Sequence, residues 1–175
     1  MRRLNRVSEL NTARSHKLEL DELFGRADKM WRRGRLRDAF KLFLSAAEKG
    51  DRASQLNVGY FYDNGMGTTK SREEALRWYK LAYRRGDASA ATNIGAIWRD
   101  EKSPRRALSW FQRAVKLGDD GSNLEIAIHY LRNEHNPRRA IRCLDRVLQS
   151  SRVSEAELEK AKRLRKAAER QMRRT

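Results

Sequence analysis

Apolar and small residues recur along this chain at a helical spacing, and the recurring block is itself repeated. Residues 72–87 and residues 104–119 share one order: Ala-Leu, any residue, Trp, an aromatic residue, Ala after two more positions, then Gly-Asp after three. A weaker copy occupies residues 38–51. This spacing places the small and aromatic residues on one side of a helix, so each block predicts an amphipathic helix.

The three blocks align column by column, which indicates repeated helix pairs. The shared columns are alanine, aromatic and alanine: Ala39, Ala75 and Ala107; Phe43, Tyr79 and Phe111; Ala46, Ala82 and Ala114. Each block closes on glycine, at Gly50, Gly86 and Gly118, followed by aspartate. A glycine just past a helix can adopt the left-handed conformation, and the aspartate can cap the next helix.

A fourth copy at residues 136–150 is degenerate, as expected of the end of an array. Cys143 occupies the tryptophan place there, which predicts a buried and unreactive thiol. Each block is preceded by a partner helix with a small residue at one place, where we expect close approach of the two helices. These small residues are Ala27, Gly59, Gly95 and Ala127.

Capping signals agree with this division. Ser71 with Glu74, and Ser154 with Glu157, have the spacing of a capping box, while Ser103-Pro104 and Asn136-Pro137 place a cap before a first-turn proline. We therefore predict helices at 18–33, 36–49, 52–64, 72–85, 88–101, 104–117, 121–133, 137–149 and 154–172.

The stretch from Asn57 to Gly67, followed by residues 73–87, resembles a Sel1-like repeat of the tetratricopeptide superhelical class, and its Gly-Met-Gly loop is the most specific element. The resemblance covers about residues 24–150. It implies an all-α, right-handed superhelical solenoid of about four antiparallel helix pairs, and a protein-binding scaffold rather than an enzyme. We expect three parts: a partly flexible N-terminal segment (1–17), the repeat array (18–150) and a basic C-terminal capping helix (151–175).

Composition adds a strong positive charge. The 175 residues carry a formal net charge of +17, with +2 in the first 26 residues and +5 in the last 24, so +10 lies in the body of the chain. An acidic partner or phosphate would suit such a surface, although a solvated arginine-rich surface is the simpler interpretation. The N-terminus lacks the apolar run of a signal peptide, no stretch suits a membrane, and one cysteine favours no disulfide scaffold. These features predict a cytoplasmic protein.

Two groups of residues are candidate binding sites. The first helices of superhelical repeats line the inner, concave side, and Asn57 and Asn93 occupy equivalent places there, where an amide can hold the main chain of an extended peptide. Helical geometry adds three further residues to this groove: Tyr60, Arg99 and Arg132. The alternative is that asparagine is merely part of the family consensus.

The second group is a basic ridge on the outer face of the second helices. Its residues fall in columns away from the alanine–aromatic stripe, or directly follow the first-turn prolines: Arg77, Arg84, Arg105, Arg106, Arg113, Lys116, Arg138, Arg139, Arg142 and Arg146. Arginine suits phosphate oxygens. If Glu73, Glu74 and Asp145 instead neutralise this ridge, its role is structural.

Catalysis finds little support in the sequence. His129, His135 and Cys143 do not have a standard zinc spacing, and no serine or cysteine stands in a recognisable nucleophile motif. We therefore predict no cofactor, no metal and no enzyme activity. The expected function is a scaffold that binds an acidic protein or extended peptide; the alternative is binding to RNA or a ribonucleoprotein through the ridge. Oligomeric state is not predicted.

Overall fold

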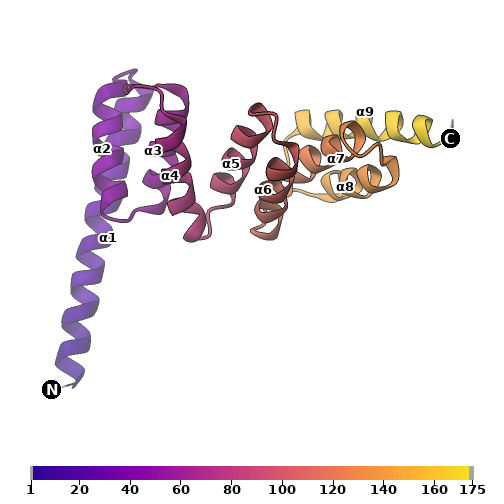
Figure 1. The fold of residues 1–175 in the computed structure, drawn as a ribbon. Helices are drawn as coiled ribbons and strands as arrows, with labels where there is room; N and C mark the ends of the chain where they lie inside the picture. The colour runs from indigo at the N-terminus through magenta and orange to yellow at the C-terminus, as the bar shows by residue number, and fades with distance from the viewer. Residues whose placement is uncertain (1, 174–175) are drawn as a thin grey trace. The chain divides into compact units, whose positions relative to one another are not determined.

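The computed structural model describes the backbone of residues 2–173 and the side chains of residues 12–173. The described residues form nine α-helices and no strand (Figure 1). The helices are α1 (Arg2–Arg32), α2 (Leu36–Glu48), α3 (Arg52–Asn64), α4 (Arg72–Arg84), α5 (Ala88–Asp100), α6 (Pro104–Lys116), α7 (Ser122–Arg132), α8 (Pro137–Gln149) and α9 (Glu155–Met172).

The predicted all-α fold of repeated helix pairs is confirmed, and eight of the nine helices begin and end within two residues of their predicted bounds. The exception is α1, which we expected near residue 18 and which begins at Arg2. No glycine or proline interrupts residues 2–24, so nothing in the local sequence stops this helix. The predicted flexibility of residues 1–17 stays a prediction, and the side chains of residues 1–11 lie outside the described part.

The glycines between helices adopt the conformation that the pattern predicts. Gly50, Gly86 and Gly118 have φ of +94°, +84° and +94°, in the left-handed region that favours glycine. Asp51 then caps α3 through the Ser54 amide, and Asp87 caps α5 through the Ala90 amide.

The third Gly-Asp turn differs from the first two. The prediction that Asp119 caps the next helix directly is wrong, because α7 begins only at Ser122. The Asp119 carboxylate instead accepts hydrogen bonds from the Gly121 amide at 3.1 Å and from the Ser122 hydroxyl at 2.8 Å. It also accepts one from Thr92 of α5, so it ties α5 to the start of α7.

Side-chain caps are confirmed at Ser71, Asn136 and Ser154, and the last of these forms the full capping box with Glu157. The predicted cap at Ser103 is wrong, since its side chain makes no capping hydrogen bond. Pro104 at the first position of α6 has no amide hydrogen to satisfy, which lowers the need for a cap.

Within each pair, the alanine–aromatic–alanine stripe packs against the small residue of the partner helix. Tyr79 and Phe111 are 0% and 3% exposed. A Cβ atom placed on Gly59 would lie 2.5 Å from the Tyr79 ring, and one on Gly95 would lie 2.7 Å from the Phe111 ring. Close approach of the paired helices therefore depends on these two glycines.

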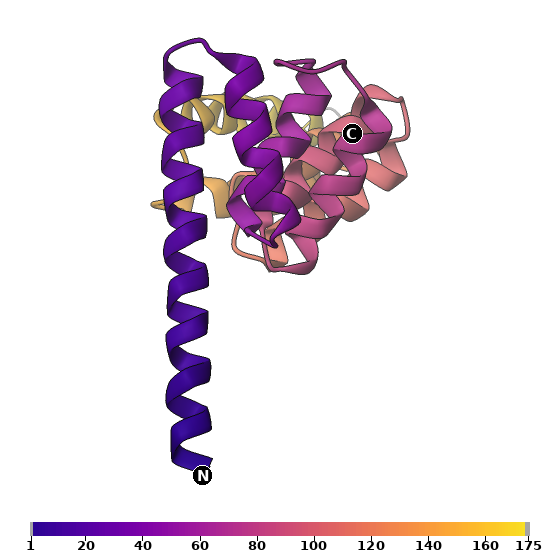
Figure 2. The same cartoon turned by 90° about the vertical axis from the view of Figure 1, so that its left-hand side faces the viewer.

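The chain divides into two compact units, residues 1–85 and 86–175. The first unit contains α1–α4, whose core is largely aromatic: Trp31 of α1 stands edge-on to Phe43 of α2 and to Phe61 of α3. Figures 1 and 2 show α1 running well past the end of α2. Leu18, on this extension, is 62% exposed.

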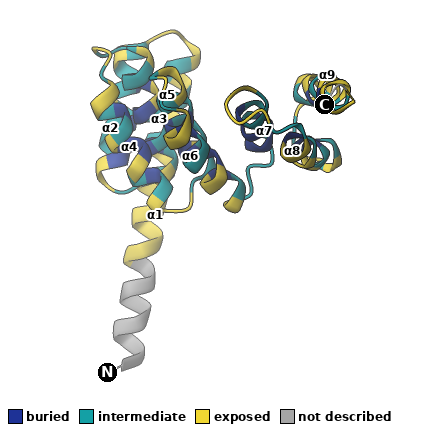
Figure 3. Ribbon diagram, turned by 45° about the vertical axis from the view of Figure 1, so that its right-hand side comes forward, coloured by how far each residue is buried: buried dark blue, intermediate teal, exposed yellow. Residues whose placement is uncertain are grey.

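The second unit contains α5–α9, and its core is mainly aliphatic. Figure 3 shows its buried residues gathered where neighbouring helices meet, with exposed residues on their outer sides. The closing helix α9 packs on α8 and also reaches α7, burying Ala161 and Ala168. Arg165 of α9 holds Asp145 of α8 at 2.7 Å, which fixes the end of the unit.

Candidate functional site

One side of α7 presents three residues at helical spacing: Glu125, Ile128 and Arg132. Two hollows flank α7, and these three residues line both of them. We call the two hollows together the α7 groove. It lies entirely within the second unit.

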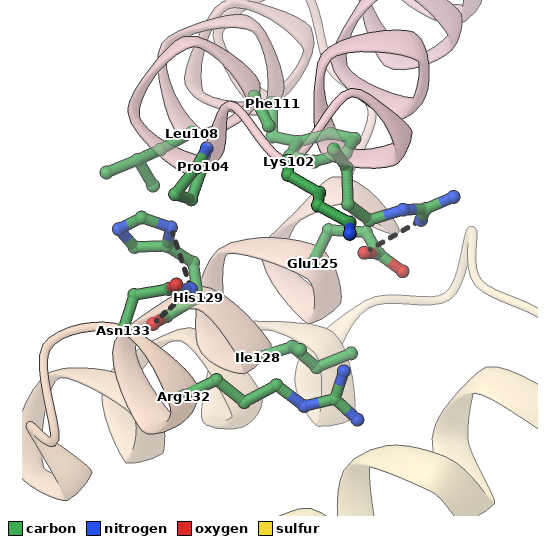
Figure 4. Close-up of a pocket in the computed structure, with 11 residues that line it drawn as sticks. Lys102, Pro104, Leu108, Phe111, Glu125, Ile128, His129, Arg132 and Asn133 are labelled. Carbon is green, nitrogen blue, oxygen red and sulfur yellow. Dashed lines mark hydrogen bonds and ion pairs between the residues drawn. The ribbon is translucent and has the colours of Figure 1, made fainter.

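The first hollow, of about 330 Å³, lies between the α5–α6 turn and α7. Its apolar walls come from Pro104, Leu108 and Phe111 of α6, with Ile128 on the other side. In Figure 4, Pro104 and Leu108 lie over His129, and Lys102 lies toward Glu125. The remaining lining residues are Arg99, Ala107, Arg132 and Asn133.

The second hollow, of about 340 Å³, lies between α7 and α9. Lys160 and Leu164 of α9 form its far wall, and Leu131 of α7 contributes to the near one. Because Arg99, Glu125, Ile128 and Arg132 also line the first hollow, the two hollows are neighbours that share these four side chains.

Four cationic side chains and one carboxylate line the α7 groove, so its electrostatic potential is positive. The Arg99 guanidinium lies 3.1 Å from Glu125 of α7 and 3.1 Å from Asp100 beside it. Partial burial acts to lower the pKa of Arg99, but the hydrogen bonds and charges of Glu125 and Asp100 outweigh it and raise the pKa above its ordinary value. Arg99 is therefore a fixed, charged part of the groove wall.

The other three cations of the groove are exposed. Lys102, Arg132 and Lys160 have no carboxylate partner among the side chains of residues 12–173. His129 is 8% exposed; its Nε2 lies 3.4 Å from a Glu134 oxygen, and Asn133 lies beside its Nδ1. The three unpaired cations are thus solvent-exposed at the edge of the α7 groove, whose base is apolar.

The predicted concave site is brought together only in part. Arg99 and Arg132 both line the α7 groove, as helical geometry suggested. Asn93 lies half-buried on α5 of the same unit but does not line either hollow. Asn57 and Tyr60 belong to α3 of the first unit, where the Tyr60 ring lies 5.9 Å from Trp31, so a groove shared with Asn93 stays a prediction.

Sequence reasoning placed only Arg99 and Arg132 of the lining residues in a groove, and those that it missed include Glu125, Ile128, Lys102 and Lys160. Two of them had a usable signal, because Glu125 stands in the repeat place of Asn57 and Asn93. Ile128 likewise stands in the place of Tyr60. Following these columns into the fourth pair, α7–α8, would have found both residues.

The predicted basic ridge is exposed, but its members differ in their surroundings. Four of its arginines lie over aromatic rings: Arg106 on Trp98 at 4.6 Å, Arg113 on Trp110 at 4.4 Å, and, more loosely, Arg77 on Trp78 and Arg139 on Tyr130. Such stacking is worth about 0.5–1 kcal/mol at exposed sites. These arginines therefore contribute to packing as well as to charge.

The carboxylates that might have neutralised the ridge do so at one position. Arg77 pairs with Glu74 at 3.2 Å, whereas Asp145 pairs with Arg165 of α9. Within the described side chains, Arg142 and Arg146 have no ion-pair partner. Arg139 of α8 pairs with Glu134 at 3.3 Å, so only part of the ridge on α8 is free of ion pairs, and whether it binds anything stays a prediction.

No cluster of three or more His, Cys, Asp or Glu side chains suited to a metal occurs among residues 12–173. Cys143 is buried as predicted, at 9% exposed, and burial raises the pKa of its thiol, with Arg146 and Arg142 opposing this weakly. In the described part of the chain, no helix is long and apolar enough to span a bilayer.

Comparison with protein families identifies the type of repeat in this chain. The Sel1 repeat model matches residues 36–51, 52–87 and 90–119, which correspond to α2, α3–α4 and α5–α6. Residues 36–119 form Sel1 repeats. The match ends before α7, so the degenerate pair α7–α8 continues the array beyond the recognisable Sel1 sequence.

Known proteins agree with this assignment. A putative sel1-like repeat-containing protein of Acanthamoeba polyphaga mimivirus is 30% identical over 86 residues, 49% of this chain and 16% of that protein. The chain therefore spans well under a fifth of this curated relative. A Sel1 repeat protein from Oxalobacter formigenes has a TM-score of 0.67 at 24% identity, over 84% of this chain and 71% of that one.

A second similar structure is YrrB, described as a TPR protein with an unusual peptide-binding site. Its TM-score is 0.58 at 17% identity, over 91% of this chain and 83% of that one. Both structural likenesses show the Sel1/TPR repeat fold alone. Proteins with this fold are generally non-catalytic scaffolds for protein interactions.

Proposed function

We propose that this chain is a non-enzymatic interaction module whose α7 groove binds an acidic segment of another protein. The observation that carries the proposal is the groove itself, which combines an apolar floor with three free cations, Lys102, Arg132 and Lys160. In a scaffold fold, a hollow with convergent polar groups is the first place to expect a ligand. YrrB, which shares the repeat fold, is itself described as having a peptide-binding site.

The chemistry of the groove favours a protein segment over a small molecule. Volumes of 330 and 340 Å³ lie at the lower end of ligand pockets, and the two hollows share four lining residues, which suits an extended ligand. An exposed ion pair contributes about 0.2–1 kcal/mol, so three cations alone give weak binding. Burying one aliphatic side chain adds about 1.5–3 kcal/mol, which makes the apolar floor necessary for useful affinity.

Retention of proteins from an extract of the source cells tests this function. The immobilised chain is compared with an Arg132→Glu/Lys160→Glu variant, and each extract is divided into an RNase-treated and an untreated half. A matched control, Arg142→Glu/Arg146→Glu, makes the same charge change on the ridge. The two side chains replaced in the groove and the two replaced on the ridge are all exposed.

We expect a set of proteins retained by the wild type and by the ridge variant, lost from the groove variant and insensitive to RNase. If the groove variant retained the same proteins as the wild type, in the same amounts, the result would contradict the proposal. Far-UV circular dichroism of both variants checks that the helices are intact.

The open charges of the ridge favour a second candidate, binding to RNA. Six of its residues are exposed with neither an ion-pair partner nor a cation–π ring among the described side chains: Arg84, Arg105, Lys116, Arg138, Arg142 and Arg146. Each phosphate that they neutralise would release counterions, so RNA affinity should fall steeply with salt. Retention that depends on RNA and disappears in the ridge variant, but not in the groove variant, would favour this candidate.

A further inference from the structure

The two hollows of the α7 groove differ in chemistry. Most of the first is bounded by carbon atoms, from Pro104, Ala107, Leu108, Phe111 and Ile128. The second also has an apolar part, from Ile128, Leu131 and Leu164, but it is bounded on its far side by Lys160 and shares Arg132 with the first. A large apolar side chain fits the first hollow, and a carboxylate at the edge of the second can reach Lys160 and Arg132.

The cations stand on both sides of the apolar floor. Lys102 follows α5 at the edge of the first hollow, while Arg132 and Lys160 stand at the end of α7 and on α9. All three are exposed and lack a carboxylate partner in the described part of the chain. A segment lying across the groove would therefore meet a cation before and after its apolar residue.

The position of Glu125 disfavours a ligand peptide that is acidic at every position. Its carboxylate lines both hollows and already occupies Arg99 at 3.1 Å, so the middle of the groove offers no free cation to a second carboxylate. A ligand carboxylate placed there would meet Glu125, and like charges at close range repel. An uncharged apolar residue is not repelled and buries its surface.

We infer that the α7 groove selects a peptide segment in which a large apolar residue is flanked on both sides by aspartate or glutamate. The apolar side chain occupies the hollow between α6 and α7, and the flanking carboxylates reach Lys102 on one side and Arg132 with Lys160 on the other. Glu125 is the specificity-determining residue, because it excludes acid from the central position. This inference rests on the proposed function and names the sequence class of its ligand.

Random twelve-residue peptides displayed on phage provide the probe. The library is cleared on immobilised Arg132→Glu/Lys160→Glu protein and then selected on the full-length wild type. We expect enrichment of one large aliphatic or aromatic position with Asp or Glu within a few residues on each side. Enriched peptides that are acidic without a fixed apolar position, or no enrichment over the cleared library, would overturn the inference.

Fluorescence anisotropy with one enriched peptide then separates the contributions. Replacing its apolar residue by serine should weaken binding at least ~10-fold, the factor that burying one aliphatic side chain supplies. Replacing that residue by glutamate should abolish binding to the wild type, and Glu125→Gln should restore part of it. Equal binding of the glutamate peptide to wild type and Glu125→Gln would refute the role of Glu125.

The outcome is distinguishable from failure of the proposed function. If groove-dependent proteins are retained from cell extract but the phage selection gives no apolar–acidic pattern, the proposed function stands and this inference is wrong. A competition experiment, in which oligouridylate is added to the bound peptide, tests whether the groove prefers a peptide to RNA. An oligouridylate that displaces the peptide from wild type and from the ridge variant alike would show that the groove accepts phosphate, against the inference.

Discussion

The close packing of α3 against α4 predicts that one added methyl group at Gly59 is destabilising. Adding a Cβ there would place it 2.5 and 2.7 Å from two carbons of the Tyr79 ring, against an ordinary separation of about 3.5–4.0 Å. The ring would have to retreat by about 1 Å, and it is fully buried. Overpacking of this kind costs about 1–3 kcal/mol, and complete burial places Gly59→Ala near the upper value.

The higher helix propensity of alanine offsets part of this cost, so the net change in the free energy of unfolding is the sum of the two contributions. Alanine is favoured over glycine inside a helix by about 1 kcal/mol. We therefore expect Gly59→Ala to lower the free energy of unfolding by about 2 kcal/mol. Gly25→Ala is the matched control, because Gly25 lies inside α1 with no atom within 4 Å of an added Cβ. There the same change should stabilise by about 1 kcal/mol.

Urea unfolding followed by circular dichroism measures both free energies, and a double variant tests the cause. Gly59→Ala/Tyr79→Leu reproduces the Ala127–Leu144 pair that the chain itself uses in its fourth helix pair. If the ring causes the destabilisation, the double variant is more stable than the sum of the single changes predicts. Gly59→Ala that stabilises as Gly25→Ala does would refute the reasoning.

Three further predictions follow from single side chains. Because burial raises the pKa of Cys143, its thiol should react slowly with Ellman's reagent near neutral pH and rapidly in urea; fast reaction of the folded protein would contradict this. Ser154→Ala removes half of the α9 capping box and should cost about 1 kcal/mol, with faster hydrogen exchange in the first turn of α9 and no change in α5. The Ser150 hydrogen bond and the Arg152 charge lower the pKa of Asp120, so its contribution to stability is present above its unfolded pKa and is lost as pH falls through the folded one. The difference in unfolding free energy between wild type and Asp120→Asn should therefore shrink on acidification, and a constant difference would count against it.

The helix pairs could be predicted because their signals are local and repeated. Each small residue, aromatic residue and closing glycine recurs in its column, so an error in one repeat is corrected by the others. The early start of α1 had no such support. Residues 2–17 lie outside every repeat, and the absence of a helix breaker is a weaker signal than a cap.

The α7 groove, which we propose as the binding surface, was harder to predict than the fold, because some of its lining residues stand in turns. Arg99 and Arg132 stand on helices, where spacing gives direction. Lys102 stands in the α5–α6 turn with φ of +55°, a left-handed conformation that no glycine announces in the sequence. Lys160 reaches the groove only because α9 packs against α7, a contact between elements that no repeat column describes.

The repeat also explains why binding chemistry can differ between helix pairs while the core stays constant. The alanine–aromatic stripe is fixed by packing inside each pair, and changing it costs stability. Asn57, Asn93 and Glu125 occupy one repeat place outside that stripe, so this place accepts both an amide and a carboxylate. We therefore expect selectivity in such an array to reside in this column, in which Glu125 meets Arg99.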